Sequence, residues 1–400
     1  MNGSEHDDLL SVAIDSKYIY INLSIFKQLF EGSSHVYYLT DYQRAVTERK
    51  IKINKLIELA RKAQIPYSLF FAPKKLVDAN IKHNEQLLFQ GVDNGIISMA
   101  GRGNVEIKDI NLIVKDIRKR QLFLAKYNKT VPENPILHIQ REQDAQLYAK
   151  LVLKSLNLDM DKLRDYKTKK SAYNFLVNEL EHANILISRS QKGAMPQAIK
   201  KDIRFSGIAV KHKKYPAIFL YTKDESDIAD PTGRRIFTIV LLLVCMSLNH
   251  FSPVSYDSNL QSPIEAKEYI IAEEILMPQE MVDGVVIESL NDIRNLSNIF
   301  KVTPSMVLMR LKRLKLIDDE HFNCFFEDLN DEREEAQMKN KKIQFKINET
   351  TKIINYNGRK FTANVLQLLG AGAISQGEAC RLLGRHRKSS SFIEKIGAAL

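Results

Sequence analysis

The chain has 400 residues, of which 44% are hydrophobic and 27% are charged, a balance typical of a globular protein and not of a disordered one. Its formal net charge of +11 favours nucleic acid or an acidic protein as a partner, although a lysine-rich genome produces the same excess without one. Its three cysteines, Cys245, Cys324 and Cys380, form no CxxC pair. Composition therefore indicates neither a disulfide framework nor a cysteine-based zinc site.

Two segments bear on where the protein works. The N-terminal residues MNGSEHDDLL are acidic and polar, without the basic and then apolar regions of a secretory signal. The longest apolar run, from Ile236 to Leu248, is shorter than the roughly 18 residues that suggest a membrane span. We therefore expect a cytoplasmic protein with no membrane partner, in which this run forms a buried core helix.

The first part of the chain predicts an N-terminal, helical pre-domain over residues 1–128. Residues 13–23 alternate in a way that suggests a strand or an extended segment, and residues 44–63 follow helical spacing. Another helix is expected at 109–126, where apolar residues recur on one face and basic residues face away. The proline-containing segment that follows predicts a linker.

Residues 137–288 predict an α+β domain with few strands. The expected helices are 143–156, 169–183, 235–249 and 264–276, and the expected strands are 185–187, 208–210 and 218–221. The 264–276 helix is expected to stop at Pro278, because proline terminates helices. We expect the small sheet to pack on the 235–249 helix, which is apolar on every face.

The remaining residues predict three further parts. Residues 289–327 form a helix–turn–helix-like unit, in which Thr303 and Pro304 cap and begin the second helix. Residues 328–358 are dense in charge and predict a linker or a solvated helix. Residues 359–400 predict a C-terminal helical extension. The predicted fold class is thus α+β and mostly helical.

The stretch 205–278 resembles a known family. It contains FSGIAVKHKKYPAIFLYTKD, then RRIFTIVLLLVCMSLNH, then IEAKEYIIAEEILMP, and this order is similar to the ImmA/IrrE zinc metallopeptidases. In that family two strands lead into a helix carrying His-Glu-x-x-His, and a second helix supplies a glutamate before a Leu-Met-Pro-like stop. The flanking segments that also resemble the family are 51–74, 106–122, 289–317 and 359–384. The resemblance implies a zincin-like helix pair beside the small sheet.

The chain departs from the family at the metal-binding helix. On the family's motif, the first histidine falls at Leu241, the glutamate at Leu242 and the second histidine at Cys245. The family's helix works because residues i and i+4 hold one zinc ion while the glutamate acts as general base. Two ligands and the base are thus replaced, and the second-helix glutamate falls at Glu265.

A residual metal site is the alternative to a lost one. Glu265, Cys245 and His250 are the three remaining candidate ligands. Against this, buried polar ligands without zinc cost roughly 1–3 kcal/mol each, and leucines at their positions remove that cost by filling the core. We therefore expect no catalytic residues and no cofactor, although zinc is the cofactor of the family that the chain resembles.

Two basic clusters are candidates for nucleic-acid binding. The residues are Arg310, Lys312, Arg313 and Lys315 on or near the second helix of the 289–317 unit, and Arg385, Arg387 and Lys388 near the C-terminus. Helices that read DNA carry such residues. In the resembled family, however, the 289–317 segment packs onto the peptidase domain, and the second cluster fits a solvated loop as well as a phosphate site.

The resemblance implies a role in phage, stress or mobile-element control, where family members occur beside repressors or toxins. We expect a catalytically inactive, metallopeptidase-like protein with a regulatory or antitoxin-like role that binds a protein partner, such as a toxin or a repressor. Two alternatives stay open. One is a DNA-binding transcriptional regulator, and the other is a metallopeptidase with an altered metal site.

Overall fold

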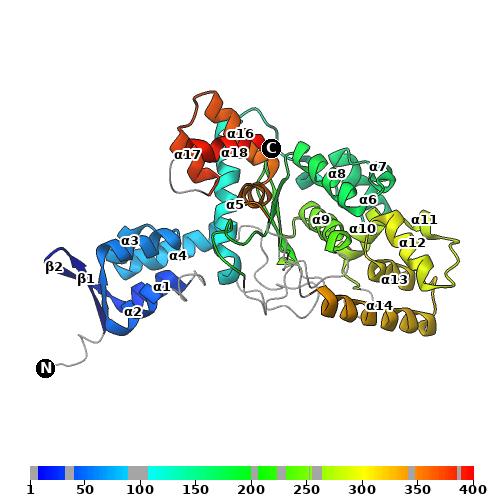
Figure 1. Ribbon diagram of the computed structural model, residues 1–400, viewed down its shortest axis with the longest axis horizontal. Coiled ribbons are helices and arrows are strands. Elements are labelled where there is room, and N and C mark those ends of the chain that lie inside the picture. The colour runs from blue at the N-terminus through cyan, green and yellow to red at the C-terminus, as the bar shows by residue number, and fades with distance from the viewer. Residues whose placement is uncertain are drawn as a thin grey trace. The chain divides into compact units, whose positions relative to one another are not determined.

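The computed structural model describes residues 8–31, 40–88, 107–199, 206–222, 231–251, 253–254, 264–340, 347–384 and 389–400 (Figure 1). They form an α+β fold made mostly of helices, with small sheets. The chain divides into two compact units. The first comprises Met1–Gln90, Val105–Lys119 and Met195–Ile203, and the second comprises Gly91–Asn104, Arg120–Ala194 and Arg204–Leu400. Within the described ranges, no helix is long and apolar enough to cross a membrane.

The first unit combines a three-stranded sheet with helices. Its strands are β1 (Leu9–Ile14), β2 (Lys17–Asn22) and β3 (Lys50–Lys52), in the order β2-β1-β3. Strand β1 pairs antiparallel with β2 and parallel with β3. One face of the sheet carries Leu10, Val12, Ile21 and Ile51, which are buried in a core shared with the helices. The helical elements described here are α1 (Leu23–Glu31), α2 (Thr40–Glu48), α3 (Ile53–Lys62), η3 (Tyr67–Phe71), α4 (Lys74–Leu88) and the start of α5 (Ile107–Tyr127).

The first unit differs from the predicted helical pre-domain over 1–128 in three ways. The single expected strand at 13–23 is a hairpin, because Asp15 adopts a φ of 50° and reverses the chain. The expected helix at 44–63 is two helices with β3 between them. The unit also stops inside α5, after Lys119.

The second unit is built around a four-stranded mixed sheet. Its strands are β4 (Leu186–Arg189), β5 (Gly207–Val210), β6 (Ala217–Leu220) and β7 (Pro253–Val254), in the order β4-β6-β5-β7. Strands β4 and β6 run parallel, and the other pairs are antiparallel. Four preceding elements belong to this unit's core, namely η4 (Pro135–His138), α6 (Ala145–Leu156), α7 (Met160–Asp165) and α8 (Lys169–His182).

Helix α9 (Pro231–Ser247) is the centre of this core. Every residue from Ile236 to Met246 is buried. The helix packs against β5, β6, α8 and α10 (Lys267–Leu276), and Figure 1 shows α9 and α10 beside one another. The approach to the sheet is close, since a Cβ added at Gly207 would lie 2.9 Å from Cδ1 of Leu242. The expected packing of the sheet on this helix is therefore found.

In the C-terminal third, every regular element among the described residues is a helix. Its helices are α11 (Gln279–Val282), α12 (Leu290–Phe300), α13 (Pro304–Arg313), α14 (Asp319–Asn340), α15 (Glu349–Asn357), α16 (Arg359–Gly370), α17 (Gln376–Leu382) and α18 (Ser390–Ala398). Of the two alternatives expected at 328–358, a linker or a solvated helix, the described residues show helix, because they hold the second half of α14 and all of α15. Helix α14 forms because Phe322, Phe325 and Phe326 bury one side of its first half.

Arg120 joins α15 to the sheet of the second unit. Its guanidinium donates to the Ser188 hydroxyl at 3.3 Å and to the carbonyl oxygens of Tyr356 and Asn357 at 2.9 and 3.2 Å. It also lies over the Tyr356 ring, 4.6 Å from the centroid. A buried charge is costly unless it is hydrogen-bonded, so these contacts from Arg120 fix the end of α15 against β4.

Glu181, near the end of α8, caps a helix that is distant in sequence. The N-cap of α16 is Gly358, which has no side chain to accept the first free N–H groups. The Glu181 carboxylate accepts from the Lys360 N–H at 3.1 Å instead. Burial raises the pKa of Glu181 from 4.5 to about 7, and the N–H groups of Lys360 and Arg359 limit that rise. The folded state is therefore favoured most when this carboxyl is protonated, because burial penalises the charged form more than the cap hydrogen bonds stabilise it.

This pKa predicts a pH dependence of stability. Between pH 4.5 and 7 the Glu181 carboxyl is protonated in the folded state and ionised in the unfolded state. The free energy of unfolding therefore falls by up to about 3 kcal/mol as pH rises through this window, and this carboxyl lowers it no further above pH 7. The variant Glu181→Gln keeps an acceptor for Lys360 and cannot ionise. We expect its unfolding free energy in urea, relative to wild type, to rise from pH 4.5 to 7 and then level off.

A surface change on the same helix, Glu179→Gln, serves as the control, because Glu179 is only half-buried. A difference between Glu181→Gln and wild type that does not vary with pH would contradict the role given to this carboxyl.

Candidate functional site

The residues at the positions of the family's zinc motif lie in the core of α9. Leu241, Leu242 and Cys245 are each at most 1% exposed. The two leucines have no atom that can coordinate a metal or activate water, and both pack among apolar neighbours. These residues therefore do not fit the zinc site of the family that the chain resembles, and no catalytic step follows from them.

Cys245 is the one motif position with a donor atom, and its surroundings keep it a neutral thiol. Burial raises the pKa of the Cys245 thiol far above its usual range, and the nearby Glu268 carboxylate raises it further. A thiol must lose its proton to act as a metal ligand or nucleophile. Cys245 thus behaves as a small apolar core residue.

Glu268, and not Glu265, is the carboxylate that α10 brings to the end of α9. Its Oε1 lies 2.5 Å from Nδ1 of His250, and its side chain is buried. Glu265 precedes the helix, because α10 begins at Lys267, and its side chain is 80% exposed. The candidate set of Glu265, Cys245 and His250 is therefore not brought together. Among the described residues, no group of three His, Cys, Asp or Glu side chains could hold a metal ion.

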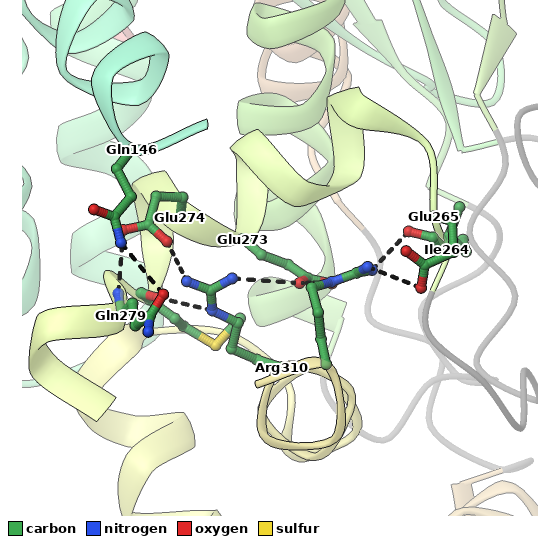
Figure 2. Close-up of polar contacts among 9 residues, drawn as sticks. Gln146, Ile264, Glu265, Glu273, Glu274, Gln279 and Arg310 are labelled. Carbon is green, nitrogen blue, oxygen red and sulfur yellow. Dashed lines mark hydrogen bonds and ion pairs between the residues drawn. The ribbon is translucent and has the colours of Figure 1, made fainter. Parts of the chain in front are cut away.

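Helix α13 is attached to α10 by a buried ion-pair network (Figure 2). The Arg310 guanidinium is 2% exposed, pairs with Glu274 and donates to the Met277 carbonyl at 3.2 Å. Glu274 also accepts from the Gln279 N–H at 3.1 Å. These contacts satisfy both charges, which is what a buried pair requires.

A second arginine extends the same network. Arg313 donates from Nε to Glu273 at 2.7 Å, from Nη1 to Glu265 at 3.1 Å and from Nη2 to the Ile264 carbonyl at 2.6 Å. Burial raises the pKa of Glu273, and the adjacent Arg313 and Arg310 guanidinium groups oppose that rise. The network therefore fixes the residues just before α10 and the C-terminal half of α10 against α13.

These contacts change the expected DNA-contacting face. Arg310 and Arg313 turn into the protein, so neither guanidinium is presented to a phosphate or base. Lys312 pairs with Asp319 and lies over the Phe322 ring, 4.9 Å from its centroid. Of the four, only Lys315 is exposed. The second basic cluster, Arg385, Arg387 and Lys388, lies outside the described residues.

A surface hollow of about 500 Å³ lies where α7, α11 and α12 meet. Met281 and Ile299 line it and are 41% and 47% exposed. Arg164 also lines it, pairing with Asp161 at 2.7 Å and donating to the Leu276 carbonyl at 3.3 Å. The hollow thus combines two exposed apolar side chains with a lining that is otherwise mostly charged or polar, namely Asp161, Arg164, Asp165, Lys167, Asn298 and Lys301.

Sequence reasoning missed Glu268, Glu273 and Glu274. The signal was present, since three carboxylates stand in a helix whose other positions are mostly apolar. Such residues need partners inside the protein, and the arginines of α13 are the partners for two of them. Pairing the two sets would have predicted the network.

Comparisons with known proteins neither support nor contradict the resemblance to the ImmA/IrrE family. No protein-family model matches the chain, and neither a curated protein nor a solved structure matches it. The features of the candidate site are an apolar helix at the family's motif positions, an internal arginine–glutamate network and a hollow beside it.

The buried pair predicts an asymmetric response to mutation. Arg310→Met leaves Glu274 charged and buried without its partner, and we expect a loss of about 3–5 kcal/mol in urea unfolding free energy. The double variant Arg310→Met with Glu274→Gln removes both charges and keeps an acceptor for Gln279. It should regain most of that loss.

The exposed pair of Arg294 and Glu332 provides the matched control. Arg294→Met should cost at most about 1 kcal/mol, because solvent screens surface ion pairs. Equal losses for Arg294→Met and Arg310→Met would show that the Arg310 network contributes no more than a surface contact.

Proposed function

We propose that this chain is a non-catalytic relative of the ImmA/IrrE metallopeptidases that acts by binding a protein partner in a regulatory or antitoxin-like role. The observation that carries the proposal is the burial of Leu241, Leu242 and Cys245. A peptidase of this type needs ligands and a general base at these positions. The leucines stabilise the core instead and leave binding as the function.

The hollow lined by Met281 and Ile299 is the surface that we assign to the partner. Exposed apolar side chains that gather around a concave surface mark interaction sites, and methionine adapts readily to a partner's shape. The Arg164 contacts to Asp161 and to the end of α10 hold the wall of the hollow rigid. A rigid surface loses little conformational entropy on binding.

The arginine–glutamate network supports the same assignment. The arginines of α13 hold that helix against α10, and α12 packs on α13. We infer that these contacts hold the α12 side of the hollow in place for the partner. A role for Arg310 or Arg313 in reading DNA is not part of the proposal, because their guanidinium groups are engaged inside the protein.

Affinity capture from the native cell tests the proposal. We expect tagged wild type to retain a specific protein, and the variant Met281→Asp with Ile299→Asp to lose it, because charges in an apolar contact must be desolvated. After incubation of the purified complex with zinc, the intact mass of the partner should be unchanged.

The control is Leu122→Asp, which places the same charge at an exposed leucine of α5. This variant should retain the partner. Cleavage of the partner by wild type would contradict the non-catalytic role, and undiminished capture by the Met281/Ile299 variant would contradict the assigned surface.

A further inference from the structure

The outer face of the sheet in the first unit carries aromatic and basic side chains. Strand register places Tyr20, Ser11 and Lys50 in one row across the sheet, and Tyr18, Ala13 and Lys52 in the next. Alternate residues of a strand point to the same side, so these six share the face opposite the buried Leu10 and Val12. Tyr18 and Tyr20 are 52% and 61% exposed, and both lysines are exposed. We call these six residues the outer face.

The composition of the outer face is ordered from one edge to the other. Tyrosines occupy β2, the small residues Ser11 and Ala13 occupy the central strand, and lysines occupy β3. The small central side chains leave room for Lys50 to reach across them. Its ammonium donates to the Tyr18 hydroxyl at 3.2 Å and lies 4.9 Å from the Tyr18 ring centroid.

This arrangement matches the chemistry of an unpaired polynucleotide. Tyrosines at alternate positions of one strand lie about 7 Å apart, twice the rise per residue, so each ring can take a separate unstacked base. Sheets that bind single strands use such aromatic side chains as stacking surfaces, with basic groups beside them for the phosphates. The six residues include two lysines and no carboxylate, so the charge of the face is complementary to phosphate.

We propose that the outer face binds single-stranded nucleic acid, with bases stacked on Tyr18 and Tyr20 and the backbone phosphates beside Lys50 and Lys52. Stacking requires the flat surface of a base, which a duplex keeps inside its helix. The face therefore prefers single strands to duplexes. This inference is independent of the partner-binding role assigned to the second unit.

Fluorescence anisotropy with the full chain tests the proposal. The probes are labelled oligonucleotides of about 15 nucleotides, as single-stranded DNA, single-stranded RNA and a DNA duplex. We expect tighter binding to one or both single strands than to the duplex, and the two single-strand arms report which sugar the face prefers. Tyr18→Ala with Tyr20→Ala should raise Kd at least about tenfold, and Tyr→Phe at both positions should restore binding.

The lysines have a separate signature in salt. The slope of the logarithm of the binding constant against log salt is negative. Lys50→Gln with Lys52→Gln should make it less steep by about 1.4, which corresponds to the loss of two phosphate contacts on a single strand. The matched control is Lys74→Gln with Lys75→Gln on α4, where both lysines are exposed. That control should leave the slope unchanged.

Ultraviolet crosslinking of wild type to an iodouracil-substituted oligonucleotide tests, without a variant, whether Tyr18 and Tyr20 contact the bases. Adducts mapped by mass spectrometry to Tyr18 or Tyr20 are expected. Any of four results would overturn the proposal, namely no binding to either single strand at low salt, equal affinity for the duplex, adducts only at other residues, or displacement by a polyglutamate peptide at an equal concentration.

Discussion

Helix α9 is apolar on all sides, and that constraint organises the second unit. A helix without a polar face must be covered all round, so the sheet lies against it at β5 and β6 while α8 and α10 cover other sides. Gly207 lets the sheet approach, because a Cβ there would meet both the Phe219 carbonyl at 2.6 Å and Leu242. A water-filled catalytic site at Leu241 and Cys245 is incompatible with that packing.

The carboxylates of the neighbouring helix α10 have a structural role. Helix α10 buries Glu268, Glu273 and Glu274, and each has a cationic or histidine partner. Buried pairs contribute little net stability over apolar residues, but they strongly penalise arrangements that separate them. The Arg310 and Arg313 contacts thus select one position of α13 on α10. Helix α12, which packs on α13 and lines the hollow beside α11, is positioned as a consequence.

Periodicity predicted α6, α8, α9 and α10 to within a few residues, because their apolar faces are continuous in sequence. Periodicity did not predict the features that depend on tertiary contacts. Glu265 was expected on α10, but the helix begins at Lys267, so the carboxylate that meets His250 is Glu268. The charge of residues 328–358 left a linker and a solvated helix as alternatives, because the phenylalanines that anchor α14 come earlier in the chain. The β1–β2 hairpin depends on one positive φ at Asp15, and the remote cap supplied by Glu181 has no local signal.

The most direct test of the account is a thermal melt of the variant Leu241→His, Leu242→Glu, Cys245→His with and without zinc. Positions 241 and 245 share one face of α9, and Glu268 approaches Cys245 from α10. The variant should be less stable than wild type without zinc, and zinc should recover part of that loss by binding only the folded state. Wild type should show no zinc-dependent shift. Adding Glu268→Gln should weaken the shift, whereas Glu265→Gln should not. A wild-type chain stabilised by zinc, or a folded variant indifferent to it, would contradict the account.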